Sequence, residues 1–542
     1  MKILIKNARV YDPINKINGD EMDILIEDGV FVDKFTNSNG IYEIDCKGRI
    51  LMQTGIDIHS HIAGGTVNVG RLMRPEDKTI VWNRNGDIRS GSGFSVPSTF
   101  LTGYEYALLG YSFVNQPITP PLTAKHTHEE LQDIPLIDKT ALLLLGNNFN
   151  VASFISNGER EKLMDYVSWM LNATKTYGIK AVNPGGFLSW LWKMERISVH
   201  ERIPKFDIKP SDIIKALEEV SNNLSLPHPF HVHLNYLGYP GNYEVTLESL
   251  KIPKKRMHVA HIQFNSYDGN DWNSFSSSAD KVMKEINKNK KISIDIGQVT
   301  LDNTTTMTAD SPFEQYLYKL TGMKWSSRDI ELECGAGIVP YIYSKSRSVN
   351  SIQWAIGLEI ALLSKDLDRL CLTTDHPNAG PFIRYPRIIA WLMSKKFRDE
   401  TARNIKLPEK KTILFSIDRE FSIYEISQIT RKSSADILGL KSTGIRSEGR
   451  ADIAIYDIRE EELKNPERIE RAFSNAEYTI IRGEIVVKEK KVVSSKKGVT
   501  FYSKREIIDE SIEKEIETFF RKRYSVGISN YIVEYPNIME VK

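Results

Sequence analysis

Two histidines separated by one residue offer the clearest chemistry in this chain. His59 and His61 stand at the end of the short apolar run 54–58. In an extended strand alternate side chains share a face, so the two imidazoles point the same way and can bind one metal ion. A catalytic metal site needs further ligands from elsewhere in the chain. The pair therefore predicts half of a metal site.

Two later strand-like segments carry a pair of histidines each. His231 and His233 lie in one, and His258 and His261 lie in the other. A single histidine is more often a structural residue than a ligand. In a barrel of parallel strands, however, functional side chains lie at the carboxyl ends of the strands, which favours His233 and His261 as ligands. His231 and His258 are then expected behind the ligands or in the packed core.

An acidic residue follows another apolar segment. Asp375 comes after residues 370–374 and shortly before Pro377, where strand pairing must stop. An aspartate at such a place usually caps a turn or a helix. Beside imidazoles it could instead bind a metal ion and exchange protons with a metal-bound water.

One lysine lies inside an apolar strand. Lys180 is flanked by residues 177–179 and 181–182, and burying an unpaired ammonium group is costly. Two interpretations stay open at this point. Lys180 either reaches the rim or a carboxylate, or it is carbamylated by CO2 and bridges two metal ions.

The elements that must position these residues fall into a centre and two ends. Residues 1–53 contain short strands with turns, and a similar texture returns in 451–457 and 478–487, so both ends are expected to form one small β-sandwich domain. Between them, strand-like segments alternate with amphipathic stretches at 161–175, 211–223 and 351–364. This alternation predicts an α/β fold, a TIM-like (β/α)8 barrel. An open doubly wound sheet is the alternative, but no GxGxxG motif follows an early strand.

We therefore expect residues 1–53 and 441–500 to form the β domain, 54–440 to form the barrel, and 501–542 to be a charged helical tail. The 542 residues carry 72 basic and 70 acidic side chains, interspersed along the chain, which argues against nucleic acid as a partner. No apolar run is long enough to cross a membrane. Cys46, Cys334 and Cys371 are too few and too scattered for disulfides or an iron–sulfur cluster, so a reducing cytoplasm is the expected compartment.

The combination of a HxH pair, a strand lysine, two later histidines and a strand-terminal aspartate resembles the binuclear amidohydrolase superfamily. The segment 449–457 also resembles that superfamily's C-terminal closure. Within it, the chain is most similar to the family of formylmethanofuran dehydrogenase A subunits. The similar segments are residues 59–64, 67–71, 74–77, 91–99, 305–310, 353–357 and 373–387.

This resemblance implies two divalent metal ions, with zinc the expected metal. It places His59 and His61 on one ion, His233 and His261 on the second, carbamylated Lys180 as the bridge, and Asp375 as ligand and proton shuttle. The implied reaction condenses formate with the amine of methanofuran, a C1 carrier, or hydrolyses N-formylmethanofuran. The implied partners are a molybdenum- or tungsten-pterin subunit, which would reduce CO2 to formate, and iron–sulfur subunits.

Two other functions remain open from the sequence. One is a stand-alone amidohydrolase of the dihydropyrimidinase or aminoacylase type. The other is a non-catalytic scaffold, which would have little use for all six candidate site residues.

Overall fold

Short parallel strands alternate with helices between residues 55 and 371. The computed structural model describes residues 1–79, 81–82, 91–328, 335–441, 444–524 and 527–541. Within these ranges eight strands form a parallel series, each paired with the next one named: β6 (Gly55–Asp57), β9 (Tyr111–Thr119), β10 (Asp138–Leu144), β11 (Gly178–Val182), β12 (Phe230–His233), β13 (Met257–Val259), β16 (Ile292–Asp295) and β20 (Leu370–Cys371). A parallel bridge between Ser60 and His376 joins the first and last strands just beyond their carboxyl ends. The predicted (β/α)8 barrel is confirmed.

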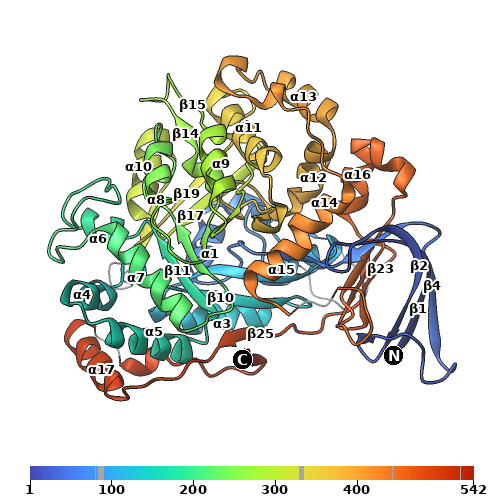
Figure 1. Ribbon diagram of the computed structural model, residues 1–542, viewed down its shortest axis with the longest axis horizontal. Coiled ribbons are helices and arrows are strands. Elements are labelled where there is room, and N and C mark those ends of the chain that lie inside the picture. Colours follow the sequence, from blue (N-terminus) through green and yellow to red (C-terminus); the bar gives the residue numbers. More distant parts are fainter. Residues whose placement is uncertain (80, 83–90, 329–334, 442–443, 525–526, 542) are drawn as a thin grey trace.

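Helices connect these strands and cover the outside of the barrel (Figure 1). Three of them, α5 (Arg160–Thr174), α7 (Pro210–Asn223) and α11 (Ser348–Leu363), lie where amphipathic stretches were predicted. Helix α7 begins for local reasons: Pro210 suits its first turn, and the Asp212 carboxylate accepts a hydrogen bond from the Lys209 N–H at 3.0 Å. Other helices of this region are α1 (Gly65–Met73), α2 (Thr99–Leu108), α3 (Ala124–Asp133), α4 (Phe149–Asn157), α8 (Tyr243–Ser249), α9 (Ala279–Lys288), α12 (Tyr385–Met393) and α13 (Lys395–Asn404). Among the described residues, no helix combines the length and the apolar character needed to cross a membrane.

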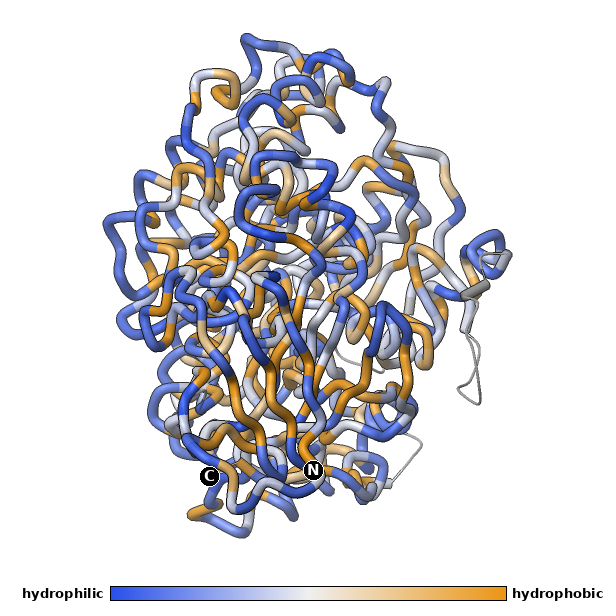
Figure 2. Tube along the Cα trace, turned by 90° about the vertical axis from the view of Figure 1, so that its right-hand side faces the viewer, coloured by the Kyte–Doolittle hydropathy of each residue, from blue (hydrophilic) through white to orange (hydrophobic). Residues whose placement is uncertain are grey.

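The strands of the two chain ends lie together beside the barrel, at the right of Figure 1. The N-terminal end contributes β1 (Lys2–Asp12), β2 (Ile17–Glu27), β3 (Val30–Phe31), β4 (Ile41–Asp45) and β5 (Ile50–Gln53), and the C-terminal end contributes β21 (Ile453–Tyr456), β22 (Tyr478–Ile481), β23 (Glu484–Lys488) and β24 (Lys491–Val492). Strands β5 and β21 pair antiparallel, with Leu51 opposite Ile455. Figure 2 shows hydrophobic and hydrophilic segments interleaved along the strands near the N-terminus. The predicted joining of the two ends in one β domain is confirmed, and in the described residues the hydrogen bonds of these strands run through a single sheet.

The segment after residue 499 contributes both strands and a helix. Strand β25 (Thr500–Ser503) pairs in parallel with the first half of β10, and β26 (Ile538–Val541) pairs with β25. Helix α17 (Ser511–Arg523) packs on α5. The helix was expected, whereas the two strands that extend the barrel sheet were not.

A small antiparallel unit is inserted between β16 and β20. It contains β17 (Asn303–Thr308), α10 (Ser311–Thr321), β18 (Ser326–Arg328) and β19 (Ala336–Ile342), with β19 in the middle of the sheet. We call these four elements the roof. Strand β19 runs very close to α10, because a Cβ atom added at Gly337 would lie 2.1 Å from the Glu314 Cβ. The barrel pattern in the sequence did not reveal this unit, since its strands pair antiparallel in a separate sheet.

Candidate metal centre

All six residues predicted to bind metal line one cavity of about 500 Å³ at the carboxyl ends of the barrel strands. They are His59, His61, Lys180, His233, His261 and Asp375, and none is more than 4% exposed. His59 and His61 follow β6, Lys180 lies in β11, His233 ends β12, and the other two follow β13 and β20. The barrel thus brings together residues up to 316 positions apart, from 59 to 375.

Asp375 lies close to three of the candidate histidine ligands. Its Oδ1 is 3.0 Å from His59 Nε2 and 3.2 Å from His61 Nε2, and its Oδ2 is 3.9 Å from His261 Nε2. Ligand atoms of His59, His61 and Asp375 all lie within 4.8 Å of one another, close enough to hold one ion. Burial pushes the pKa of Asp375 up, but the imidazoles of His261 and His59 together hold it well below its usual value. Asp375 is therefore a carboxylate.

Lys180 carries an unusual amine. Its side chain is 1% exposed, and its Nζ makes no hydrogen bond to any residue that the structure describes. Burial lowers the pKa of Lys180 to about 7, although Asp295 and Asp375 oppose the shift. A buried amine with this pKa is partly neutral at physiological pH, and neutral amines are the form that reacts with CO2.

His233 and His261 face each other, with ring centroids 4.8 Å apart. His233 Nε2 lies 3.4 Å from the Asp310 carboxylate, and His261 Nδ1 has no hydrogen bond within the described part of the chain. Burial lowers the pKa of both imidazoles, so each is neutral at pH 7. Neutral imidazoles are competent metal ligands.

Hydrogen bonds of backbone and side-chain groups fix the turn that carries the HxH pair. The fully buried Asp57 accepts the His59 N–H at 3.0 Å and the hydroxyl groups of Tyr106 and Tyr385 at 2.7 and 2.5 Å. The His61 N–H donates to the His376 carbonyl at 2.7 Å. These bonds tie the first ligand loop to the last one, which carries Asp375.

His231 and His258 lie behind the ligands. His231 Nε2 is 3.1 Å from His59 Nδ1, and its Nδ1 is 2.9 Å from His228 Nε2. His258 Nε2 contacts Asp295 at 3.1 Å, and its Nδ1 contacts Ser293. His59, His231 and Asp295 form a second group whose ligand atoms lie within 4.8 Å.

Asp295, at the end of β16, was missed by the sequence reasoning. Its Oδ2 is 3.2 Å from His59 Nδ1. Its Oδ1 accepts hydrogen bonds from the backbone N–H of His261 at 2.9 Å and from the Thr373 hydroxyl group at 2.7 Å. A carboxylate on Nδ1 holds the proton there and leaves His59 Nε2 free for a metal ion. The available signal was the same one that identified Asp375, an aspartate that ends a buried strand.

Asp310, which lies between β17 and α10 of the roof, was also missed. Besides its contact with His233, it accepts a hydrogen bond from the Asn183 side chain at 2.9 Å and from the Phe313 N–H at 3.2 Å. Asn235 in turn donates to Asn183 at 2.8 Å. The roof is thereby connected to a candidate ligand.

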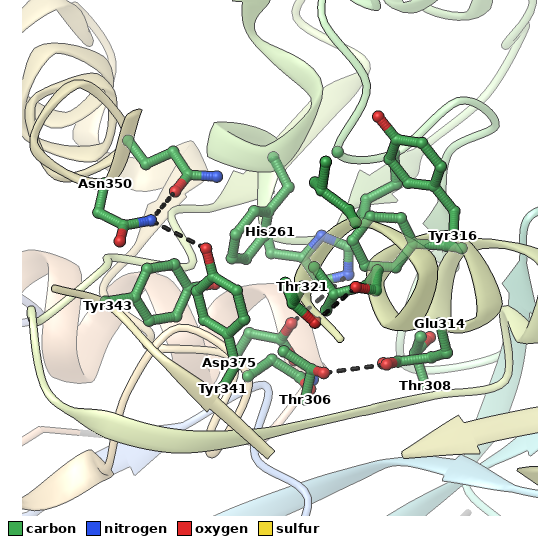
Figure 3. Close-up of a pocket in the computed structure, with 18 of the residues that line it drawn as sticks. His261, Thr306, Thr308, Glu314, Tyr316, Thr321, Tyr341, Tyr343, Asn350 and Asp375 are labelled. Carbon is green, nitrogen blue, oxygen red and sulfur yellow. Dashed lines mark hydrogen bonds and ion pairs between the residues drawn. The ribbon is translucent and has the colours of Figure 1, made fainter. Parts of the chain in front are cut away.

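The outer part of the cavity is lined by the roof and by the start of α11 (Figure 3). Figure 3 shows Tyr341, Tyr343 and Asn350 on one side and Tyr316 on the other, with His261 between them. Most of these walls are aromatic or aliphatic, and the polar exceptions near Asp375 are Thr306, Thr308, Glu314 and Asn378. This shape suits an organic substrate whose reacting group lies at the deep polar end.

The barrel and its buried set of candidate metal ligands are typical of metal-dependent hydrolases, and comparison with known families agrees. The chain belongs to the amidohydrolase family, whose profile matches residues 42–487.

Two curated relatives match nearly the whole chain. Protein FwdA of Methanocaldococcus jannaschii is 46% identical, covering 100% of this chain and 98% of that protein. The A subunit of the formyltransferase/hydrolase complex Fhc of Methylorubrum extorquens is 34% identical over 98% of this chain and 96% of that protein.

Among solved structures, the formyltransferase/hydrolase complex FhcABCD of Methylorubrum extorquens with methylofuran matches with a TM-score of 0.92. That match has 32% sequence identity and covers 100% of this chain and 99% of that chain. Dihydropyrimidinase from Brevibacillus agri shares the fold, with a TM-score of 0.50, 14% identity, and coverage of 94% of this chain and 100% of that chain.

Proposed function

We propose that this chain is a metal-dependent formyl hydrolase/transferase subunit. It condenses formate with the amine of methanofuran or a similar carrier, and it runs the reverse hydrolysis of the N-formyl product. The observation that carries this proposal is the convergence of six ligand-type residues in one buried cavity, in a chain similar over its full length to formyltransferase/hydrolase subunits. The alternative of a stand-alone dihydropyrimidinase has only a shared fold in its support.

The residues present fit two divalent ions, and zinc is the metal we expect. Lys180 is a buried amine without a partner among the described residues, and its surroundings offer four imidazoles and a carboxylate, which is the nitrogen and oxygen donor set that zinc accepts. We assign His59 and His61 to one ion, His233 and His261 to the other, and Asp375 as a further ligand. Lys180, once carbamylated, would bridge them. Ions held there would bring the pKa of a bound water toward neutrality and polarise the formyl carbonyl group.

Asp375 moves the proton in this proposal. Its carboxylate is ionised and faces His59 and His61, so it can accept a proton during hydrolysis and deliver it to the departing amine nitrogen. In the condensation direction the same oxygen removes a proton from the incoming amine. Asp295 and Asp310 orient the imidazoles of His59 and His233, and the apolar walls of the outer cavity exclude bulk water.

We further propose that the chain works inside a complex with subunits that supply formate, of the molybdenum- or tungsten-pterin and iron–sulfur type. A solved structure that matches this chain over its full length is that of the complex FhcABCD. In this proposal the redox chemistry that produces formate belongs to those partners.

Metal analysis and formate release test the proposal on the chain purified with its complex. Wild type should hold about two divalent ions per chain and release formate from N-formylmethanofuran. Lys180→Met should hold fewer ions and lose at least about 100-fold in kcat/KM, as expected for loss of a metal bridge.

Lys139→Met is the matched control, because Lys139 is an equally buried lysine of β10 that donates to the Ile134 carbonyl and does not line the cavity. It should keep both ions and the activity. A wild-type protein that folds without metal, or with metal but no formate release, would overturn the proposal.

A further inference from the structure

Glu314 is a buried acid that the proposed chemistry does not use. It lies in α10, has no exposed surface, and lines the same cavity as the six candidate ligands. Its Oε2 lies 2.9 Å from the Thr306 hydroxyl oxygen, as the dashed line in Figure 3 shows. Its Oε1 has no hydrogen-bond partner among the residues that the structure describes. A buried acceptor in that state is costly, which points to a partner that arrives with the substrate.

The surroundings of Thr306 allow a protonated Glu314. The Thr306 hydroxyl oxygen also lies 2.8 Å from the Val339 carbonyl oxygen. A hydroxyl group has one hydrogen, and a carbonyl group can only accept. If Thr306 donates to Val339, the short contact with Glu314 requires Glu314 to donate, so its Oε2 carries a proton.

The electrostatic environment agrees with a neutral acid. Burial raises the pKa of Glu314 well above its usual value; the hydrogen bond with Thr306 opposes this shift, and the negative charges of Asp310 and Asp375 add to it. With the proton on Oε2, the free Oε1 is a carbonyl-type acceptor. It can receive an N–H or O–H donor but attracts a cation far less than a carboxylate would.

We infer that Glu314 is a specificity residue whose Oε1 accepts a hydrogen bond from the N–H of a secondary formamide substrate, and from the amine nitrogen of the deformylated carrier. This inference rests on the proposed function. A secondary formamide has one N–H beside its reacting carbonyl carbon, and Glu314 shares the cavity with Asp375, the group proposed to exchange protons with that nitrogen.

The neutral form of Glu314 favours the condensation of formate with the carrier amine. A carboxylate at this place would pair with an ammonium group and favour the protonated amine, which has no lone pair to attack formate. A neutral acceptor binds the N–H of the free amine and leaves its lone pair available. The Thr306 hydroxyl and the nearby backbone of β19 hold the acid in this orientation.

Two variants and two substrates test the inference on the metal-loaded complex. The substrates are the N-formyl carrier, a secondary formamide, and its N-methyl-N-formyl analogue, which lacks the N–H. Wild type should prefer the secondary formamide, and Glu314→Met should lower kcat/KM for it about 10- to 100-fold while leaving the poor turnover of the analogue nearly unchanged. The Glu314→Met variant should therefore lose most of its preference for the secondary formamide.

Glu314→Gln is the conservative variant, because a carboxamide can donate to Thr306 and present a carbonyl oxygen to the substrate. It should recover most of the activity and the preference that Glu314→Met loses. Glu359→Met is the matched control, since Glu359 is a fully buried glutamate of α11 that accepts hydrogen bonds from Ser277 and Thr412 and does not line the cavity. It should keep the substrate preference even if thermal unfolding shows a less stable protein.

The outcomes separate this inference from the proposed function. No formate release by the metal-loaded wild type contradicts the proposed function. An active wild type without preference for the secondary formamide, or a Glu314→Met variant that keeps the preference, overturns the role of Glu314. A Glu314→Gln variant as impaired as Glu314→Met overturns it as well, because the negative charge would then be what matters. The wild-type and Glu314→Gln results are readable even if Glu314→Met fails to fold.

Discussion

Lys180 and Lys139 are buried to the same degree in neighbouring barrel strands, yet their neighbours differ. Burial lowers the pKa of each to about 7. The Lys139 amine donates to the Ile134 carbonyl at 2.9 Å, whereas the Lys180 amine faces the cavity without a hydrogen bond to any described residue. An unpaired amine beside imidazoles is chemically available in a way that a satisfied one is not. The position in the cavity, rather than burial alone, distinguishes the candidate ligand.

Asp295→Asn tests whether Asp295 acts through its neighbours. The Asp295 carboxylate contacts His59 Nδ1 and accepts a hydrogen bond from the backbone N–H of His261. Without the carboxylate, the proton of the His59 imidazole can move to Nε2, the atom proposed to bind the metal. We therefore expect metal binding to weaken about 10- to 100-fold. Competition between the protein and a chelator measures this change. Asp302→Asn is the control, because Asp302 pairs with Arg384 at 2.8 Å and does not line the cavity. Unchanged metal affinity in Asp295→Asn would contradict a positioning role.

The candidate metal ligands and the residues that orient their side chains were not equally predictable from the sequence. The HxH pair is local, and strand ends of a barrel converge whatever the intervening sequence, so His59 and Asp375 could be placed in one site without a structure. Asp295 ends a strand too, but its contact with His59 depends on how the strands come together around the barrel. Asp310 and Glu314 were out of reach, because they belong to an insertion whose position over the barrel is set by tertiary packing alone.

The roof forms much of the outer wall of the cavity at the mouth of the barrel. Its β17 and β19 pair antiparallel from Asn303 opposite Ile342 to Thr308 opposite Gly337, and α10 packs against β19. Asp310 is the N-cap residue of helix α10, and its side chain accepts the Phe313 N–H and also contacts His233. One residue therefore caps the helix and reaches a candidate ligand, so the position of the whole helix is coupled to the site.

Gly337→Ala tests this coupling. A Cβ there would lie 2.1 Å from the Glu314 Cβ, so β19 and α10 must separate and shift Glu314. We expect kcat/KM for formate release to fall by at least about 10-fold while two ions stay bound, because displacement by about 1 Å is enough to misplace a substrate.

Gly322→Ala is the control in the same unit. Gly322 ends α10 with a φ of 65°, and no atom lies within 4 Å of an added Cβ. This change should cost about 1 kcal/mol of stability through backbone strain and leave formate release intact. Equal losses of activity in the two variants would show that the contact with Glu314 is not what matters.

At the scale of the whole molecule, the β domain and the segment after residue 499 both contact strand β10 of the barrel. The carboxylate of Asp138, at the start of β10, pairs with Arg450 and with Arg482, which lie just outside the strands of the β domain. The segment after residue 499 adds β25 to the edge of β10 and places α17 on α5. The sequence predicted that the ends join, because their strand patterns are alike. The sequence could not predict that β25 pairs with β10. Residues 142–144 of β10 pair with β11, which leaves residues 139–140 on the same edge to pair with β25, and no sequence pattern marks that division.

Phe520 and Phe519 allow the contribution of this last segment to be measured without cutting the chain. Phe520 has no exposed surface and packs on Tyr531, which in turn contacts Trp169 of α5, while Phe519 is partly exposed on the same helix. Phe520→Ala should lower the free energy of unfolding by about 3 to 5 kcal/mol, and Phe519→Ala by at most about 1 kcal/mol. Denaturant titration followed by far-UV circular dichroism measures both. Because α17 contributes no residue to the cavity, metal content and KM should stay at wild-type values in both variants below the unfolding transition. A Phe520→Ala protein as stable as Phe519→Ala would mean that α17 is not part of the cooperative fold, and altered metal content would mean that this helix supports the site directly.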